Sequence, residues 1–280
     1  MPPGVTINLP KNSKIKAEWV VPSSSIEVKT KDEIIFDIDL KGNPWIGIDG
    51  IYLFNPLKRT IFSVSSPIKD FAFLETGEFV VATGEALGYL LPSESSSKLK
   101  FLPILNLPSG SPKLFPGEGL TLYISIWREK DKLTEVYRLR EEKGKPIAEK
   151  FLTIKNKVND ICEGQSGIYI AIEKGIFKIV PDEITPIQPI FRHKEEIKEI
   201  ECDSKKGIFY VTINRIGYLD SQKSFDFGHV PNVEIKVKED SLFIFFTKTM
   251  GVIKIKGVEN FSKSFSEDYK TLKNEDNNEN

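Results

Sequence analysis

The sequence predicts an all-β protein, a six-bladed β-propeller of four-stranded antiparallel blades in which an N-terminal strand closes the last blade. A hairpin pattern, two short apolar runs joined by a turn, occurs six times in the 280 residues. Matched positions of its second run recur at intervals of 35 to 48 residues, which is typical of propeller blades. No segment has a sustained helical period, and a sheet of about two dozen strands must close or split.

The clearest hairpin runs from Gly42 to Leu53 and reads GNPWIGIDGIYL. Residues on both sides of its centre are β-branched, aromatic or apolar, as strands prefer. Asp49-Gly50 at the centre favours the positive φ angles of a tight two-residue turn. With an inner strand over 35–40 and an outer strand over 60–64, this hairpin makes the first unit.

The other five units repeat this plan of inner strand, hairpin and outer strand. They begin near Ile68, Leu114, Val158, Ile197 and Val230. The third unit is the least regular because four prolines interrupt the approach to its inner strand and the strand itself. Its hairpin is still clear, since apolar runs over 120–127 and 133–139 flank the polar turn 129–132.

The two ends of the chain are treated differently. The strand around 16–21 has no partner in the first unit, so we expect it to complete the last blade and remove an open sheet edge. Residues 1–265 are therefore predicted to form a single propeller domain. Residues 266–280 are polar, lack an apolar pattern, and are predicted to be a disordered tail.

Composition excludes several classes of partner. The 39 basic and 40 acidic residues give no net field for nucleic acid, and apolar runs are too short for membrane insertion. The first residues lack the basic and apolar parts of a signal peptide, so the default location is cytoplasmic, or extracytoplasmic if a leader has been removed. The many Lys, Glu and Ile residues, with only two Met, indicate a heat-adapted, thermophile source.

The two cysteines, Cys162 and Cys202, lie about one repeat apart on the inner strands of neighbouring units. Free cysteine behaves as a small buried hydrophobe, so we expect buried free thiols. The alternatives are a disulfide bridge or a reactive pair.

The run GNPWIGIDGIYL, preceded by Phe36-Asp37-Ile38-Asp39, resembles a repeat of the two-component-regulator (sensor) type of propeller. Those repeats carry Gly-Asn-x-Trp-Ile-Gly-Thr followed by Gly-Gly-Leu-Tyr; here Ile48 replaces the Thr, and Asp49 and Ile51 replace the first Gly and the Leu. Units that are more loosely similar have glycines before an apolar strand: Gly77, Gly167 and Gly207. The resemblance implies a propeller fold but no particular activity, because such repeats serve unrelated functions.

Acidic or amide residues occupy the same position at the start of five inner strands. They are Asp37, Asp70, Asp160, Glu199 and Asn232. Inner strands of a propeller begin near one mouth of its central channel, so these side chains are predicted to form a ring there. Like charges in a ring repel unless a cation or basic partner offsets them, which predicts a ligand or cation site suited to calcium or magnesium. The structural alternative is that these carboxylates accept hydrogen bonds from backbone amides.

Turn and connection residues are predicted to form a rim around this ring. They are Asp49, Glu85, Glu173, Arg215, His193 and His229. The two histidines are the only ones in the chain, and each precedes an inner strand. They are candidates for ligands of a transition metal, or else ordinary surface loop residues.

Two hypotheses for function follow. The sequence has no phosphate-binding loop, nucleophile elbow or zinc motif, and we assign no catalytic residue. The leading hypothesis is a non-catalytic scaffold that recognises a protein partner or ligand through its loop face. The alternative is a metal-dependent hydrolase or lactonase with a cation at the channel mouth, held by Asp37, Asp70, Asp160 and Glu199. The oligomeric state stays open.

Overall fold

The computed structural model describes residues 1–25, 27–30, 33–92, 97–181, 183–221 and 223–268. The chain is all-β, with 56% of residues in strands and 4% in helices. Internal contacts divide it into two compact units. Unit 1 comprises Met1–Glu27, Gly164–Ser166 and Glu199–Asn280, and unit 2 comprises Val28–Glu163 and Gly167–Lys198.

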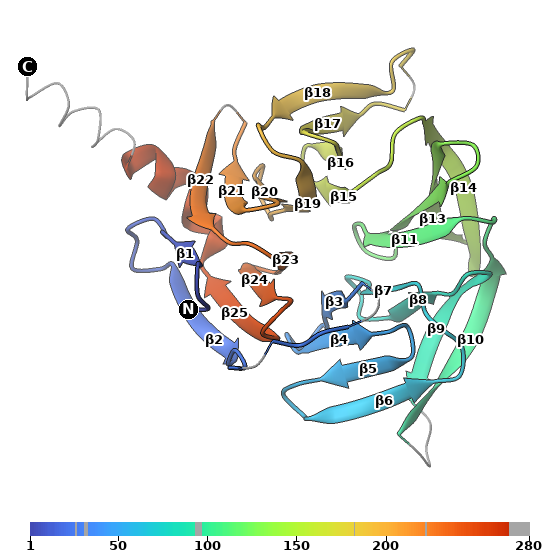
Figure 1. The fold of residues 1–280 in the computed structure, drawn as a ribbon. Coiled ribbons are helices and arrows are strands. Elements are labelled where there is room, and N and C mark those ends of the chain that lie inside the picture. Colours follow the sequence, from blue (N-terminus) through green and yellow to red (C-terminus); the bar gives the residue numbers. More distant parts are fainter. Residues whose placement is uncertain (26, 31–32, 93–96, 182, 222, 269–280) are drawn as a thin grey trace, which may run out of the picture. The chain divides into compact units, whose positions relative to one another are not determined.

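Unit 2 contains an eight-stranded sheet in the order β3-β4-β5-β6-β10-β9-β8-β7 (Figure 1). Its strands are β3 (Ile35–Ile38), β4 (Pro44–Ile48), β5 (Tyr52–Asn55), β6 (Thr60–Val64), β7 (Asp70–Phe73), β8 (Phe79–Ala82), β9 (Ala86–Pro92) and β10 (Lys98–Asn106). Asp49 and Gly50 between β4 and β5 have the predicted positive φ angles, 53° and 67°, but Ile48 pairs with Tyr52, so the connection has three residues and not two.

The eight-stranded sheet corrects the prediction of six separate four-stranded sheets. It consists of two consecutive four-stranded meanders, β3–β6 and β7–β10, whose outer strands pair with each other. The parallel pairing of β6 with β10 is short, with Ser63 opposite Lys98 and Val64 opposite Leu99. This pairing covers part of the edge that each outer strand would otherwise leave open.

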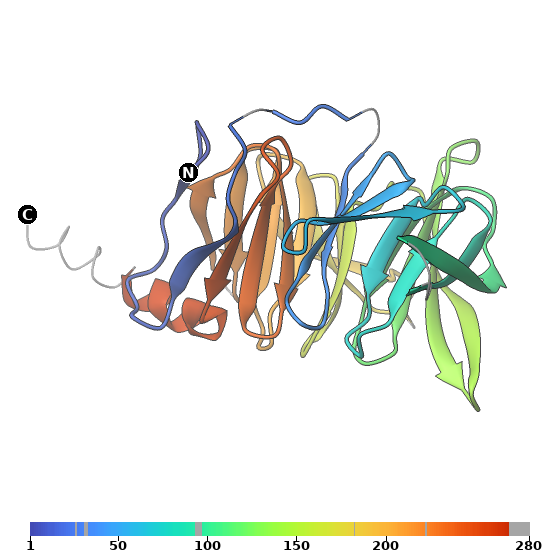
Figure 2. The ribbon, with the colours of Figure 1, turned by 90° about the horizontal axis from the view of Figure 1, so that it is seen from below.

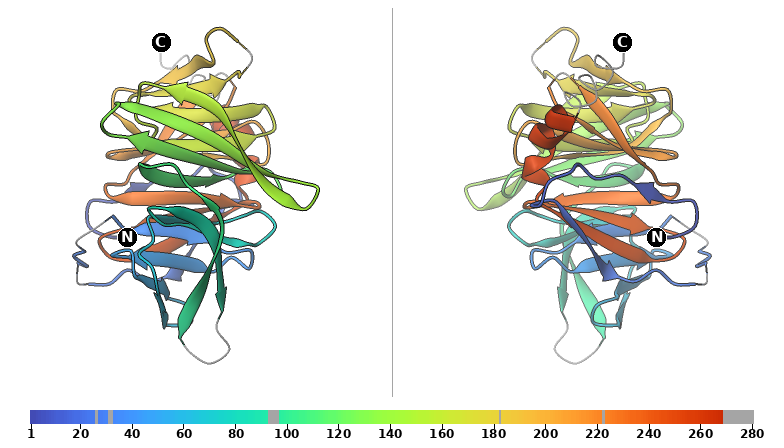
Figure 3. Two further views of the ribbon diagram at one scale, coloured as in Figure 1. Left: turned by 90° about the vertical axis from the view of Figure 1, so that its right-hand side faces the viewer. Right: turned by 90° about the vertical axis from the view of Figure 1, so that its left-hand side faces the viewer.

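Two four-stranded antiparallel meanders complete the sheets of unit 2. The first has β11 (Ser111–Pro116), β12 (Leu122–Arg128), β13 (Leu133–Glu142) and β14 (Lys145–Ile154). The second has β15 (Asp160–Gly164), β16 (Gly167–Ile172), β17 (Gly175–Ile179) and β18 (Ile187–Arg192). Strands β13 and β14 have ten residues each and form a long hairpin, green in the left view of Figure 3.

Unit 1 contains two sheets, and the N-terminal segment contributes an edge strand to each. The five-stranded sheet has β1 (Thr6–Ile7), β22 (Ser224–His229), β21 (Arg215–Leu219), β20 (Ile208–Thr212) and β19 (Ile197–Cys202). The four-stranded sheet has β2 (Lys16–Val21), β25 (Gly251–Lys256), β24 (Ser241–Phe246) and β23 (Val233–Lys238). The pairing of β2 with β25, visible in Figure 2, confirms that the N-terminal strand completes the last sheet.

A short helical segment follows β25 and was not predicted. A 3-10 turn, η1 (Val258–Asn260), leads into a helix over 261–268, red in the right view of Figure 3. Phe261 and Phe265 pack on aromatic rings of the five-stranded sheet, with Phe265 stacked 4.7 Å from Phe225. Residues 266–268 are therefore helical, and the remainder of the predicted disordered tail, 269–280, lies outside the described residues.

Both cysteines are disulfide-bonded, so the expectation of free thiols is wrong. No helix in the described part of the chain is long and apolar enough to cross a membrane.

Candidate functional site

Asp37 lies in β3 with 1% of its surface exposed, and its carboxylate is used by the backbone. Oδ1 accepts a hydrogen bond from the amide of Ile38 at 2.8 Å. Oδ2 accepts one from the amide of Phe73 in β7, also at 2.8 Å. The side chain therefore ties the first strand of one meander to the first strand of the next.

Asp70 repeats this arrangement one unit later. Its Oδ1 accepts from the amide of Phe71 at 2.9 Å, and its Oδ2 accepts from the amide of Leu114 in β11 at 2.7 Å. Asp160 is buried and accepts from the amide of Ile161 at 2.8 Å. These bonds match the structural alternative proposed for the strand-start acids.

The remaining two members of the predicted ring differ from the aspartates. Glu199 is half-buried in the middle of β19. Asn232 is exposed, precedes β23, and has a left-handed φ of 56°; its carbonyl oxygen accepts from the amide and hydroxyl of Thr247 at 3.0 Å each. The position of Asn232 is thus set by its backbone.

The predicted rim residues lie in turns or at strand ends. Asp49 and Glu173 are turn residues with positive φ, and Glu85 is exposed between β8 and β9. His193 follows β18, and its Nδ1 accepts from the amide of Glu195 at 3.0 Å. His229 ends β22, where it is exposed and lies opposite Arg215.

A protein-bound cation does not fit these residues as they stand. Calcium and magnesium need several oxygen ligands converging on one point. Among the described residues, no group of three or more His, Cys, Asp or Glu side chains is placed to hold a metal ion. Both carboxylate oxygens of Asp37 and of Asp70 already accept backbone hydrogen bonds. The ring as a cation site stays a prediction, and no chemical step below depends on it.

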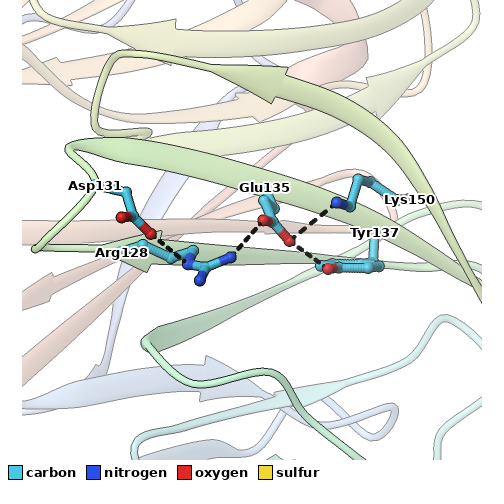
Figure 4. A network of polar contacts seen from close by, with 5 residues as sticks. All are labelled: Arg128, Asp131, Glu135, Tyr137 and Lys150. Atoms are coloured by element: carbon cyan, nitrogen blue, oxygen red, sulfur yellow. Dashed lines mark hydrogen bonds and ion pairs between the residues drawn. The ribbon is translucent and has the colours of Figure 1, made fainter.

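A different polar cluster lies on the sheet β11–β14. Glu135 of β13 is at its centre and is 6% exposed. Its Oε1 accepts a hydrogen bond from Arg128 Nη1 at 2.9 Å, and Oε2 accepts one from the hydroxyl of Tyr137. Lys150 Nζ of β14 lies 3.5 Å from Oε2, and Asp131 Oδ2 lies 3.0 Å from Arg128 Nε (Figure 4). We call these five residues the Glu135 cluster.

Glu135 and Tyr137 shift each other's pKa in opposite directions. The hydrogen bond from Tyr137 is the main cause that lowers the pKa of Glu135; burial opposes it, and Arg128 and Lys150 lower it further. Burial, followed by the interaction with Glu135, raises the pKa of Tyr137 to about 12. Because these shifts keep Glu135 ionised and Tyr137 neutral at pH 7, this pair is not poised for general acid–base catalysis.

What the cluster offers is an anchored pair of cations. The side chains of Arg128 and Lys150 are 41% and 51% exposed, while the carboxylate that holds both is buried. Such groups can donate hydrogen bonds to a carbonyl oxygen or to negative charge that develops on it. The sequence contained one signal for this site: Glu135 alternates with Leu133, Tyr137 and Leu139, so it places a charge on an otherwise apolar or aromatic strand face.

No family model matches the sequence, and no curated relative matches it. Solved structures are similar along most of the chain. A gluconolactonase from Xanthomonas campestris has a TM-score of 0.60 at 10% identity, covering 90% of this chain and 95% of that chain. Virginiamycin B lyase from Staphylococcus aureus has a TM-score of 0.56 at 13% identity, covering 90% and 94%. Regucalcin, a calcium-binding protein from Agrobacterium tumefaciens, has a TM-score of 0.54 at 13% identity, covering 84% of this chain and 92% of that chain.

These similarities establish the fold class as an all-β propeller. They do not support the specific two-component-regulator type of repeat. At such low identity they carry the fold alone, and an activity has to be argued separately.

Proposed function

We propose that this protein is a hydrolase that opens lactone or related cyclic ester rings. The observation that carries the proposal is the similarity along nine tenths of this chain to a gluconolactonase, a protein named for its action on a lactone. Virginiamycin B lyase is also named for an enzymatic activity, but a lyase breaks bonds without water, so it does not support hydrolysis. We therefore favour the hydrolase or lactonase hypothesis from the sequence over the non-catalytic scaffold hypothesis.

The Glu135 cluster supplies the groups for the reaction in this proposal. Water adds to the ester carbonyl carbon and loses a proton to solvent, and negative charge develops on the carbonyl oxygen. Arg128 and Lys150 donate hydrogen bonds to that oxygen, while Glu135 pairs with both cations and is itself held by the Tyr137 hydroxyl. The ring C–O bond then breaks, and the alcohol oxygen takes a proton from solvent. The products are a carboxylic acid and an alcohol on one open chain.

The test is hydrolysis of a panel of γ- and δ-lactones by the full chain, measured by acid release and corrected for the spontaneous rate. Arg128→Gln and Lys150→Gln are expected to lower kcat/KM by about 100-fold each, the loss typical of removing one oxyanion donor. Arg192→Gln is the control, because Arg192 is exposed at the end of β18, outside the cluster. Turnover that is unchanged in both cluster variants would contradict the assignment of the site.

The cation hypothesis is tested in the same assay. Asp70→Asn keeps the size of the side chain but removes its charge. If strand-start acids bind calcium or magnesium, added cation would raise the rate of the wild type and chelator would lower it, and both effects would disappear in Asp70→Asn. Rates that do not change with added cation or chelator would contradict the cation hypothesis.

The second candidate function is a non-catalytic module that recognises a protein partner. Asp37 and Asp70, the candidate cation ligands of a hydrolase, accept backbone hydrogen bonds and so have a structural role. This observation favours the non-catalytic module. The absence of turnover on every lactone would make it the better proposal. Simultaneous substitution of the exposed rim residues Glu85 and Glu173 of unit 2 would then be expected to abolish capture of the partner without lowering the melting temperature.

We also propose that the two meanders of the eight-stranded sheet act as two blades, which makes six in all. In the described residues, two residue pairs of the sheet ladder join their outer strands, and each meander keeps its own set of antiparallel pairings. Val64→Pro is designed to interrupt the junction at its edge and is expected to leave the melt a single cooperative transition. Two separated transitions would contradict the proposal.

A further inference from the structure

Arg138 lies on the face of β13 opposite the Glu135 cluster and is incompletely paired. It stands in a row across three strands, with Tyr123 of β12 on one side and Glu149 of β14 on the other. Its Nε is buried and has no hydrogen-bond partner. Its Nη2 is 3.7 Å from Glu149 Oε2, which is too far for a hydrogen bond.

The carboxylate opposite Arg138 is held by a second arginine. Arg140 Nη2 donates to Glu149 Oε1 at 2.6 Å. Arg138 and Arg140 are two residues apart on a strand, so they share a face, and together they meet one carboxylate with two positive charges. The side chains of the two arginines are 36% and 47% exposed, so solvent can reach both.

The surroundings of Arg138 hold its side chain in place. The guanidinium carbon lies 5.8 Å from the centroid of the Phe151 ring, and that ring is 5.7 Å from the ring of Tyr123. The Tyr123 hydroxyl interacts with both Arg138 and Glu163, and the carboxylate of Glu163 accepts a hydrogen bond from the amide of Glu118 at 3.0 Å. Arg138 is thus held in place with its buried Nε unpaired, and the exposed end of its guanidinium lies beside a second arginine.

We propose that Arg138 and Arg140 form a binding site for a small organic carboxylate. A guanidinium presents its N–H groups in a planar arrangement that matches the two oxygens of a carboxylate. Arg138 does not form such a bidentate pair with Glu149. The bound carboxylate would lie over the exposed ends of the two side chains, next to Glu149. This site is separate from the Glu135 cluster. The proposal of a carboxylate site does not depend on whether the protein hydrolyses lactones.

The test follows the arginine Nε–H signals of the full chain by NMR while sodium acetate is added at constant ionic strength. The sequence has six arginines, so the signal of Arg138 is the one that disappears in Arg138→Lys. We expect this signal to shift saturably, with a Kd of about 1 mM or weaker for so small a probe. Arg138→Lys, which keeps the charge and loses the fork, is expected to weaken acetate binding by about tenfold, and Arg192→Met to leave it unchanged.

Three outcomes would overturn the proposal. One is the absence of any saturable shift, which would mean that the face of the Phe151 ring satisfies Nε–H. Another is acetate binding by Arg138→Lys that equals binding by the wild type. The third is an equal loss in Arg192→Met, which would indicate general attraction of anions to the surface. Melting curves of each variant exclude unfolding as the cause of a loss.

Discussion

In the described part of the chain, tyrosines that donate a hydrogen bond to a carboxylate lie in two sheets, and a pair from one sheet differs from a pair in the other in what else the carboxylate accepts. In the five-stranded sheet of unit 1, the hydroxyl of Tyr218 donates to Asp203 Oδ2 at 2.6 Å. Asp203 Oδ1 accepts from the amides of Lys205 and Gly207 at 2.8 and 2.9 Å. Both side chains are buried.

In the sheet β11–β14 of unit 2, Tyr137 donates to Glu135 in the same way. The remaining contacts of Glu135 are to Arg128 and Lys150, whose side chains are about half exposed. Backbone amides cannot leave a carboxylate without unfolding a turn, whereas exposed cations can turn towards a ligand. The Asp203 pair therefore stabilises a turn, and the Glu135 pair is the one suited to binding.

The largest expected effect concerns the buried pair. Asp203→Ala leaves two backbone amides and the Tyr218 hydroxyl without a partner, so we expect a loss of about 3 kcal/mol in the free energy of unfolding. Tyr218→Phe removes a single hydrogen bond and is expected to cost about 1 kcal/mol. Urea unfolding measures both. A loss below that of Tyr218→Phe would show that Asp203 does not organise the turn.

A smaller effect is expected for the second pair. Glu135→Gln keeps the shape of the side chain but loses its charge, and we expect a loss of about 1 kcal/mol because its cationic partners are half exposed. Folding lowers the pKa of Glu135, so its negative charge stabilises the folded state fully above the ordinary pKa of 4.5. This stabilisation is lost as the pH falls through the folded-state pKa. The difference between wild type and variant should thus close below pH 4.5. A difference that is constant down to pH 2 would contradict this assignment.

The smallest effect distinguishes the pairs by salt. Arg128→Gln removes the ion pairs of a half-exposed cation with Glu135 and Asp131, and is expected to destabilise the protein less than Glu135→Gln does. In 1 M salt, where the screening length is about 3 Å, this cost should shrink further, while the cost of Tyr218→Phe should not change. Equal salt dependence of the two variants would remove the distinction between the pairs.

The hairpins and the closing strand could be predicted because their signals are local. Asp49-Gly50 encodes its own turn, and the apolar alternation over 16–21 requires a sheet partner. The junction of β6 with β10 could not be predicted, since two residue pairs between distant strands leave no pattern in the sequence. The helix over 261–268 is short, and only Phe261 and Phe265, four residues apart, indicate its buried face.

The candidate site was harder to predict than the fold. The strand-start acids were recognised as a set, but the amides that they bind, such as Phe73 for Asp37, lie 36 residues away. Sequence position alone could not decide between a cation and a backbone amide as partner. The Glu135 cluster draws its members from three strands and a turn, so no contiguous motif announces it.

The most direct test of the account is the rate of lactone ring opening by the full chain with and without an intact Glu135 cluster. We expect turnover above the spontaneous rate on at least one lactone, lowered about 100-fold in Arg128→Gln and unchanged in Arg192→Gln. No turnover on any lactone, or equal turnover in Arg128→Gln and Arg192→Gln, would contradict the proposed function of the Glu135 cluster.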